Sequence, residues 1–222
     1  MKYSRKNPSK AYLDNIQHYK EMHKKGFSTS AGEQKLAKDA YDGKSTLPYV
    51  KIIKNIIDNN KCKSLLDYGC GKAKFYNQKF TTNKASYPKL KKYWNIKTLL
   101  YDPCFEKYNK FPKSKSDLTI CIDVLEHIPQ NDTDWVLEEI LSLTNKITFI
   151  NIACYPAMAI LPNGQNAHIN IKNAEWWQKK LIKYSKIFKK IKILALCDYR
   201  RKEGDIKWLS IDIRDHIKKY LN

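Results

Sequence analysis

Arginine is scarce in this strongly basic chain. The 222 residues carry a formal net charge of +20, yet lysines scattered along the whole chain supply nearly all of it, and the arginines are only Arg5, Arg200, Arg201 and Arg214. Because arginine is favoured for bidentate phosphate contacts, its scarcity weakens a nucleic-acid interpretation of the charge. The abundant Asn, Ile and Tyr favour an AT-rich coding sequence as its source. Nucleic acid stays open as the alternative partner.

Long apolar segments are also missing. No run approaches the length needed to cross a bilayer, and the polar residues 1–6 lead into no hydrophobic signal core. We therefore expect no membrane span and a cytoplasmic location.

Paired cysteines are absent too. The six cysteines form no C-x-x-C pair and show no zinc-type spacing. Cys121, Cys154 and Cys197 lie in or beside predicted strands, where a reduced cysteine packs as a small apolar residue. Free thiols in a reducing compartment are therefore favoured over disulfides.

The chain has the length and apolar content of one domain with its own core, since 42% of its residues are hydrophobic. No internal repeat or low-complexity linker divides it. Residues 1–44 contain a helical period over 9–25, and we treat them as a helical extension. Residues 45–222 form the main unit.

Apolar runs alternate with helical segments in the main unit, which predicts an α/β fold. Helices are predicted over 47–59, 135–141 and 174–186, and the segment 74–94 is expected to contain a helix that is interrupted near Pro88. Parallel strands are predicted at 63–67, 97–101, 118–122 and 146–153. Residues 190–199 and 206–213 predict a closing antiparallel hairpin with its turn at 200–205. The expected architecture is a three-layer sandwich with a mostly parallel sheet.

The first predicted strand runs through Asp67 and Tyr68 into a glycine-spaced turn at Gly69 and Gly71. Glycine permits a tight turn and lets a ligand approach the main chain without a Cβ in the way. In open α/β sheets, such turns at the carboxyl end of a strand bind nucleotide-like cofactors. A bare structural turn is the alternative.

Two further strands end in acidic residues. Asp102 and Pro103 follow the strand at 97–101, and the strand at 118–122 runs into Asp123, Val124, Leu125, Glu126 and His127. An acidic residue at the end of the second strand accepts ribose hydroxyls in dinucleotide sites. An ordinary Asp-Pro turn is the alternative for Asp102.

Together, these three segments resemble a class I S-adenosylmethionine-dependent methyltransferase over roughly residues 45 to 215. The loop 161–170 before Trp176 and Trp177 is similar to that of uncharacterised bacterial and phage methyltransferase-like proteins. The resemblance implies a Rossmann-like methyltransferase sandwich in the cytosol of a bacterium or of a phage-infected host. Two features depart from the family: Ala73 replaces the third glycine of the first motif, and the short gap after Asp102 leaves the family's third strand reduced or missing.

The resemblance also implies a binding mode for S-adenosylmethionine. The backbone of Gly69 and Gly71 would contact the methionine moiety and ribose, Asp67 would anchor the turn and the ammonium group, and Asp102 would accept the ribose hydroxyls. The full set of cofactor contacts that it implies is Asp67, Tyr68, Gly69, Gly71, Asp102, Pro103, Asp123 and Val124.

The catalytic residues that it implies are His127 as base or substrate contact, with Glu126 and His168 beside it. In the purely structural alternative, His127 packs on the following helix and Glu126 is a capping acid near the N-terminus of that helix. Asp123, Glu126, His127 and His168 also resemble the metal site of small-RNA 3′-end 2′-O-methyltransferases, which suggests Mg or Mn. The same string also occurs in many methyltransferases where no metal is expected, so a metal-free site is the alternative. Tyr12, Tyr19 and His23 of the extension could cap the site, although packing is the favoured explanation for them.

The sequence therefore predicts an S-adenosylmethionine-dependent methyltransferase with an unknown acceptor, a small metabolite or sugar-type O or N acceptor being favoured. The alternatives are a metal-assisted RNA 2′-O-methyltransferase and a non-catalytic protein that keeps the cofactor fold. A dinucleotide-dependent oxidoreductase ranks behind these, because its fingerprint needs glycine where Ala73 stands.

Overall fold

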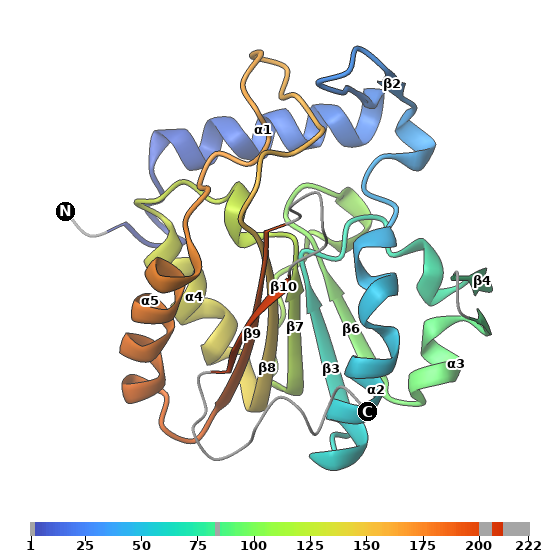
Figure 1. Ribbon diagram of the computed structural model, residues 1–222, viewed down its shortest axis with the longest axis vertical. Coiled ribbons are helices and arrows are strands. Elements are labelled where there is room, and N and C mark those ends of the chain that lie inside the picture. The colour runs from blue at the N-terminus through green and yellow to red at the C-terminus, as the bar shows by residue number, and fades with distance from the viewer. Residues whose placement is uncertain (1–2, 83–84, 200–205, 211–222) are drawn as a thin grey trace.

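A single mixed sheet forms the centre of the molecule (Figure 1). The computed structural model describes residues 3–82 and 85–199, together with the backbone of 206–210. The strands lie in the order β10-β9-β8-β7-β3-β6. Their bounds are β3 (Ser64–Tyr68), β6 (Lys97–Tyr101), β7 (Ser116–Ile122), β8 (Thr144–Ala153), β9 (Lys192–Asp198) and β10 (Ile206–Ser210). The first five of these are parallel, and β10 pairs antiparallel with β9.

Helices cover both faces of this sheet, as a parallel sheet requires. The helices α2 (Val50–Asn59) and α3 (Leu90–Trp94) lie on one face, and α4 (Thr133–Ser142) and α5 (Ala174–Ile187) on the other (Figure 1). Successive residues of a strand point to opposite faces, so Leu65 packs with Ile53 of α2 while Leu66 packs with Val136 of α4. The predicted α/β class with a mainly parallel sheet is confirmed, and this arrangement is compatible with a Rossmann-like fold.

Shorter elements connect these layers. The pairs β1 (Phe27–Ser28) with β2 (Gln34–Lys35) and β4 (Phe80–Thr81) with β5 (Ser86–Tyr87) form small antiparallel ribbons. The 3-10 turns are η1 (Ala37–Asp39), η2 (Lys44–Tyr49), η3 (Lys74–Tyr76), η4 (Glu106–Tyr108) and η5 (Leu125–His127). The turns η4 and η5 follow β6 and β7, where they shape the carboxyl edge of the sheet.

The helix predicted within 74–94, with an interruption near Pro88, is reduced to the short α3 after that proline. The chain there forms η3, the ribbon of β4 and β5, and the short helix α3. Phe80 stacks on Tyr87 with ring centroids 5.2 Å apart, and Phe75 packs edge-on against Phe80. Aromatic packing, together with the break at Pro88, therefore replaces a helical face that the spacing alone suggested.

The helix α1 (Lys10–Lys25) crosses the carboxyl edge of the sheet, above the strands in Figure 1. A buried carboxylate fixes its start. Asp132 accepts hydrogen bonds from the Ser9 backbone N–H (3.0 Å), from the Ser9 hydroxyl and from Trp135 Nε1 (2.8 Å). Ser9 in turn accepts from the Tyr12 N–H as the N-cap of α1. One side chain thus joins α1 to α4.

Parts of the predicted hairpin fall outside the description. The turn predicted at 200–205 and residues 211–213 of the last predicted strand lie outside the described residues.

All six cysteines are free thiols. None of the helices in the described part of the chain is long and apolar enough to cross a membrane.

The buried carboxylate of Asp132 generates a stability prediction. Asp132→Ala leaves three donors without their acceptor, so we expect the free energy of unfolding to fall by about 2–4 kcal/mol in urea denaturation. The matched control is Asp14→Ala, which removes an exposed pair with Lys10 and should cost at most about 0.5 kcal/mol. Equal losses in the two variants would contradict this role of Asp132.

Candidate functional site

The candidate site lies where the strand order reverses. From β3 the chain proceeds to β6 on one side and then to β7 on the other, and ligands of open α/β sheets bind at the carboxyl ends of the strands beside such a reversal. The loops after β3, β6 and β7 meet there in one pocket. The predicted strand ends are therefore brought together in space.

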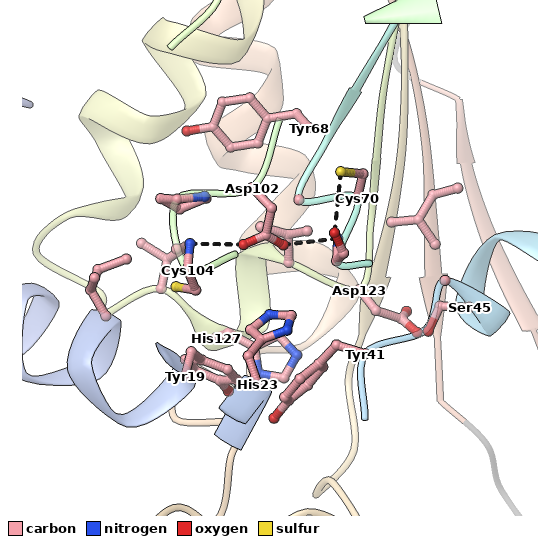
Figure 2. Close-up of a pocket in the computed structure, with 18 of the residues that line it drawn as sticks. Tyr19, His23, Tyr41, Ser45, Tyr68, Cys70, Asp102, Cys104, Asp123 and His127 are labelled. Carbon is pink, nitrogen blue, oxygen red and sulfur yellow. Dashed lines mark hydrogen bonds between the residues drawn. The ribbon is translucent and has the colours of Figure 1, made fainter. Parts of the chain in front are cut away.

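The N-terminal extension forms one side of the pocket, and Tyr19, His23 and Tyr41 lie below Asp102 in Figure 2. The pocket holds about 930 Å³ of space not filled by protein atoms, including the part open to solvent. The sheet-side lining consists of Tyr68, Gly69, Cys70, Gly71, Asp102, Pro103, Cys104, Ile122, Asp123, Val124, His127 and Ile128. The extension and the turn η2 add Tyr12, Asn15, Ile16, Tyr19, His23, Tyr41, Gly43, Ser45 and Thr46.

Both glycines of the first motif are required by protein neighbours. Gly69 has φ 86°, and a Cβ there would lie 2.3 Å from Cγ2 of Val124. Gly71 has φ 56°, and its Cβ would lie 2.3 Å from the Tyr41 carbonyl oxygen. The Lys72 N–H donates to that same oxygen at 2.7 Å. The glycine turn therefore docks directly on the backbone of the extension.

Asp102 links two of the pocket loops. Its Oδ2 accepts from the Gly71 N–H and its Oδ1 from the Cys104 N–H, both at 2.8 Å (Figure 2). Burial raises the pKa of this carboxyl, and the two backbone donors oppose that shift. Asp102 lines the pocket as predicted. Each oxygen keeps a second lone pair, so the carboxylate can accept further hydrogen bonds from a ligand.

Asp67 does not line the pocket. Its Oδ2 accepts from the Tyr76 hydroxyl at 2.8 Å, and burial raises its pKa to about 7. The carboxyl thus links β3 to η3 through Tyr76. Because Asp67 is not among the pocket residues, the geometry does not support the predicted contact with a ligand ammonium group. The neighbouring Tyr68 does line the pocket, with its hydroxyl donating to Glu139 at 2.5 Å.

The loop after β7 presents Asp123 and Val124 to the pocket, and Pro103 lines it from the β6 side. Asp123 has φ 52°, in the left-handed region that side chains rarely adopt. Its N–H donates to the Asn151 carbonyl at 3.3 Å, which holds the turn against β8. Unusual backbone of this kind clusters at functional sites, where the surrounding structure maintains it.

His127 lies on η5 at the pocket wall. Its Nδ1 is 2.9 Å from the Ala167 carbonyl oxygen and 2.6 Å from the Tyr19 hydroxyl. Burial lowers its pKa to about 3, so the ring is neutral near pH 7. The Ala167 carbonyl can only accept, hence Nδ1 carries the ring proton and Nε2 has the basic lone pair.

Glu126 and His168 lie behind His127, outside the pocket lining. Glu126 is fully buried, and its Oε1 accepts from the Ala153 N–H at 3.0 Å. The alternative in which Glu126 caps a helix N-terminus is therefore wrong. The His168 Nε2 atom lies 4.0 Å from Glu126 Oε1. Ligand atoms of Glu126, His127 and His168 lie within 4.8 Å of one another.

Asp123 is not part of this three-residue group, to judge from the ranges that the structure describes. Including it in the predicted metal-ligand set was wrong in that respect. The left-handed turn at Asp123 directs the chain so that this residue lines the pocket, while Glu126 enters the core beneath it. Its negative charge still adds to burial in raising the pKa of Glu126.

The extension contributes side chains that sequence reasoning undervalued. Tyr12, Tyr19 and His23 line the pocket, and Tyr41 joins them from a segment without periodicity. The His23 ring stacks on Phe105, with ring centroids 5.2 Å apart. Its Nδ1 is buried without a hydrogen-bond partner among the described residues. Burial, and then the charge of Lys72, lower its pKa to about 4.

Comparisons with protein-family models, with curated proteins and with solved structures find no match for this chain.

The docking of the glycine turn on the extension can be tested with two glycines of positive φ. Gly32→Ala has nothing within 4 Å of the new Cβ and should lose about 1–2 kcal/mol of unfolding free energy from backbone strain alone. Gly71→Ala adds the clash with Tyr41, so we expect a further loss of about 1–3 kcal/mol in urea denaturation. Similar losses for both variants would exclude the close approach.

The buried neutral His23 predicts a pH dependence of stability. The pKa of His23 is about 4 in the folded protein and 6.5 for the free side chain. Between pH 6.5 and pH 4 the unfolded chain therefore binds a proton at this residue, whereas the folded protein does not. Its contribution is complete above pH 6.5 and is lost at about 1.4 kcal/mol per pH unit as the pH falls towards 4. His23→Gln should flatten the profile by that slope over this window, whereas parallel profiles would refute the prediction.

Proposed function

We propose that this protein is an S-adenosylmethionine-dependent methyltransferase of the Rossmann-like class. The charge of the pocket is the observation that carries the proposal. Its lining contains two carboxylates, Asp102 and Asp123, and the described part of the chain contributes no lysine or arginine to it. The chain as a whole has a formal net charge of +20. The lysines and arginines that give the chain its positive charge are thus absent from the described lining of this pocket, where a nucleotide-like ligand would bind.

This charge pattern distinguishes between cofactors. S-adenosylmethionine carries a sulfonium and an ammonium group but no phosphate, so carboxylates at the site favour it. Dinucleotides carry a pyrophosphate, and the described lining offers no lysine or arginine to neutralise it, while Asp123 adds a negative charge. Asp102 does not distinguish between the two cofactors, because dinucleotide sites also place a carboxylate at the ribose. The pocket chemistry therefore supports S-adenosylmethionine over NAD, as the sequence motifs do.

The binding mode follows from the lining residues. Asp102 accepts from Gly71 and Cys104 and keeps lone pairs for the two ribose hydroxyls. The backbone at Gly69 and Gly71 would contact the methionine moiety and ribose, with Tyr68, Pro103, Asp123 and Val124 completing the contacts. Asp123 lines the pocket and is better placed than Asp67 to receive the ammonium group.

Methyl transfer is an in-line displacement in which the enzyme chiefly positions donor and acceptor. The acceptor lone pair attacks the methyl carbon, the carbon–sulfur bond breaks, and its electron pair stays on sulfur as a thioether. If the acceptor carries a proton, a base must remove it. His127 is the candidate base or acceptor contact, because it lines the pocket and its Nδ1 proton is directed to Ala167, which leaves Nε2 to accept from the acceptor. Burial lowers its pKa to about 3, so in the empty pocket it is a weak base and suits a hydrogen-bonding contact to the acceptor better than full removal of a proton.

A small metabolite or sugar-type molecule suits this pocket better than RNA does. The helix α1 lines one side of the pocket and narrows the space beside the strand ends, and the described lining offers no cationic side chain for a phosphate backbone. Salt-sensitive RNA binding would favour the RNA alternative. Cofactor binding without methyl transfer to any acceptor would favour the non-catalytic alternative.

Calorimetric titration tests the proposal. We expect S-adenosylmethionine and S-adenosylhomocysteine to bind and NAD to give no heat. Asp102→Asn removes the charge and one acceptor at the proposed ribose site, so the affinity for S-adenosylmethionine should fall about tenfold or more.

The matched control is Asp117→Asn at the amino end of β7, where the carboxylate contacts Lys63 and Lys146. Its affinity should equal that of the unmodified protein. Binding of NAD in preference to both adenosyl compounds, or unchanged affinity in Asp102→Asn, would overturn the assignment.

A further inference from the structure

We propose that Glu126, His127 and His168 form a binding site for one divalent ion of the zinc class, rather than for the Mg or Mn that the sequence suggested. This inference stands on the geometry of the three side chains and does not depend on the identity of the cofactor in the adjacent pocket.

Both histidines are held in the tautomer that metal ligands use. His127 Nδ1 contacts the Ala167 carbonyl oxygen at 2.9 Å, and His168 Nδ1 contacts the Tyr155 carbonyl oxygen at 2.5 Å. A carbonyl oxygen can only accept, so each Nδ1 is the donor, and Nε2 is the nitrogen of each ring that remains to bind an ion. Metal-binding histidines are oriented by hydrogen bonds of this type.

Glu126 supplies a buried oxygen that lacks a partner. Its side chain is 0% exposed, and while Oε1 accepts from the Ala153 N–H, Oε2 has no hydrogen bond among the described residues. The His168 Nε2 atom at 4.0 Å from Oε1 is too distant for a hydrogen bond. A buried carboxylate oxygen without a partner is costly, and a cation between the three side chains would remove that cost.

The three ligand atoms are close to the required spacing. They lie within 4.8 Å of one another, whereas a tetrahedral ion with bonds of about 2.1 Å separates its ligands by about 3.4 Å. Small side-chain rotations close this difference. The ring centroids of His127 and His168 are 4.7 Å apart at an interplanar angle of 69°, so the two rings converge without stacking.

The donor set selects the type of ion. Two imidazole nitrogens and one carboxylate oxygen suit Zn²⁺, Fe²⁺, Co²⁺ or Ni²⁺, whereas Mg²⁺ prefers an all-oxygen octahedron with several waters. Asp123, which would have made the set richer in oxygen, lies outside the group. His127 also lines the pocket, so an ion on its Nε2 would lie at the border between the pocket and the buried Glu126. Such an ion would occupy the lone pair that His127 otherwise offers to the acceptor, so the two roles of Nε2 exclude each other.

Cobalt binding to the full-length protein tests the site. After treatment with a chelator and dialysis, the protein is titrated with Co²⁺ by visible absorption, and Zn²⁺ and Mg²⁺ compete in parallel titrations. We expect one equivalent of Co²⁺ with a nitrogen and oxygen spectrum, displaced by Zn²⁺ at a concentration at least about tenfold lower than by Mg²⁺.

The informative variant is His168→Asn, whose amide can still donate to the Tyr155 carbonyl but which lacks Nε2. We expect its Co²⁺ affinity to fall at least about tenfold, while His18→Asn on α1 retains full affinity. Circular dichroism and S-adenosylmethionine titration of each variant verify the fold independently. Absence of stoichiometric binding, preference for Mg²⁺, a thiolate charge-transfer band, or full affinity in His168→Asn would each overturn the proposal, without affecting the result for the adenosyl cofactor.

Discussion

The hydrogen bonds of Asp102 to two backbone amides hold the candidate site together. They join the turn after β3 to the turn after β6, and the turn after β3 in turn rests on the Tyr41 carbonyl of the extension. Because these contacts lie at the reversal of strand order, they create the pocket floor before any ligand binds. Burying the Asp102 carboxylate is unfavourable because the charge loses its hydration, and the two fixed backbone N–H donors offset that cost. The polar groups of the site are therefore already oriented before a ligand binds.

The pocket divides into two chemically different regions. Around Asp102 and the glycine turn, backbone amides and a carboxylate offer both donors and acceptors to a nucleoside. Around His127, neutral imidazole, tyrosine hydroxyl and buried carboxyl groups offer proton acceptors and ligand atoms. In the function that we propose, the first region would hold the cofactor and the second would contact the acceptor. The extension matters to both, since Tyr19 contacts His127 and Tyr41 contacts the glycine turn.

Much of the sheet and of the site floor could be predicted from the sequence, because buried parallel strands are short apolar runs and their ends carry the polar residues. The helix predicted within 74–94 is shorter than expected. The aromatic contacts that replace its first part, such as Phe80 with Tyr87, produce no periodic pattern in the sequence. The sequence could not show that the side chains of Asp67 and Glu126 point away from the pocket. The pleat of β3 decides this for Asp67, and the left-handed turn at Asp123 decides it for Glu126. Tyr41 was missed since its role depends on a long-range backbone contact.

A crystal structure of the protein with S-adenosylhomocysteine tests the central claim most directly. The account predicts the ribose hydroxyls within hydrogen-bond distance of the Asp102 carboxylate, with the thioether sulfur directed towards the side of the pocket that His127 lines. Electron density for the nucleoside away from the turns after β3 and β6, or a ribose that leaves Asp102 without a ligand contact, would contradict it.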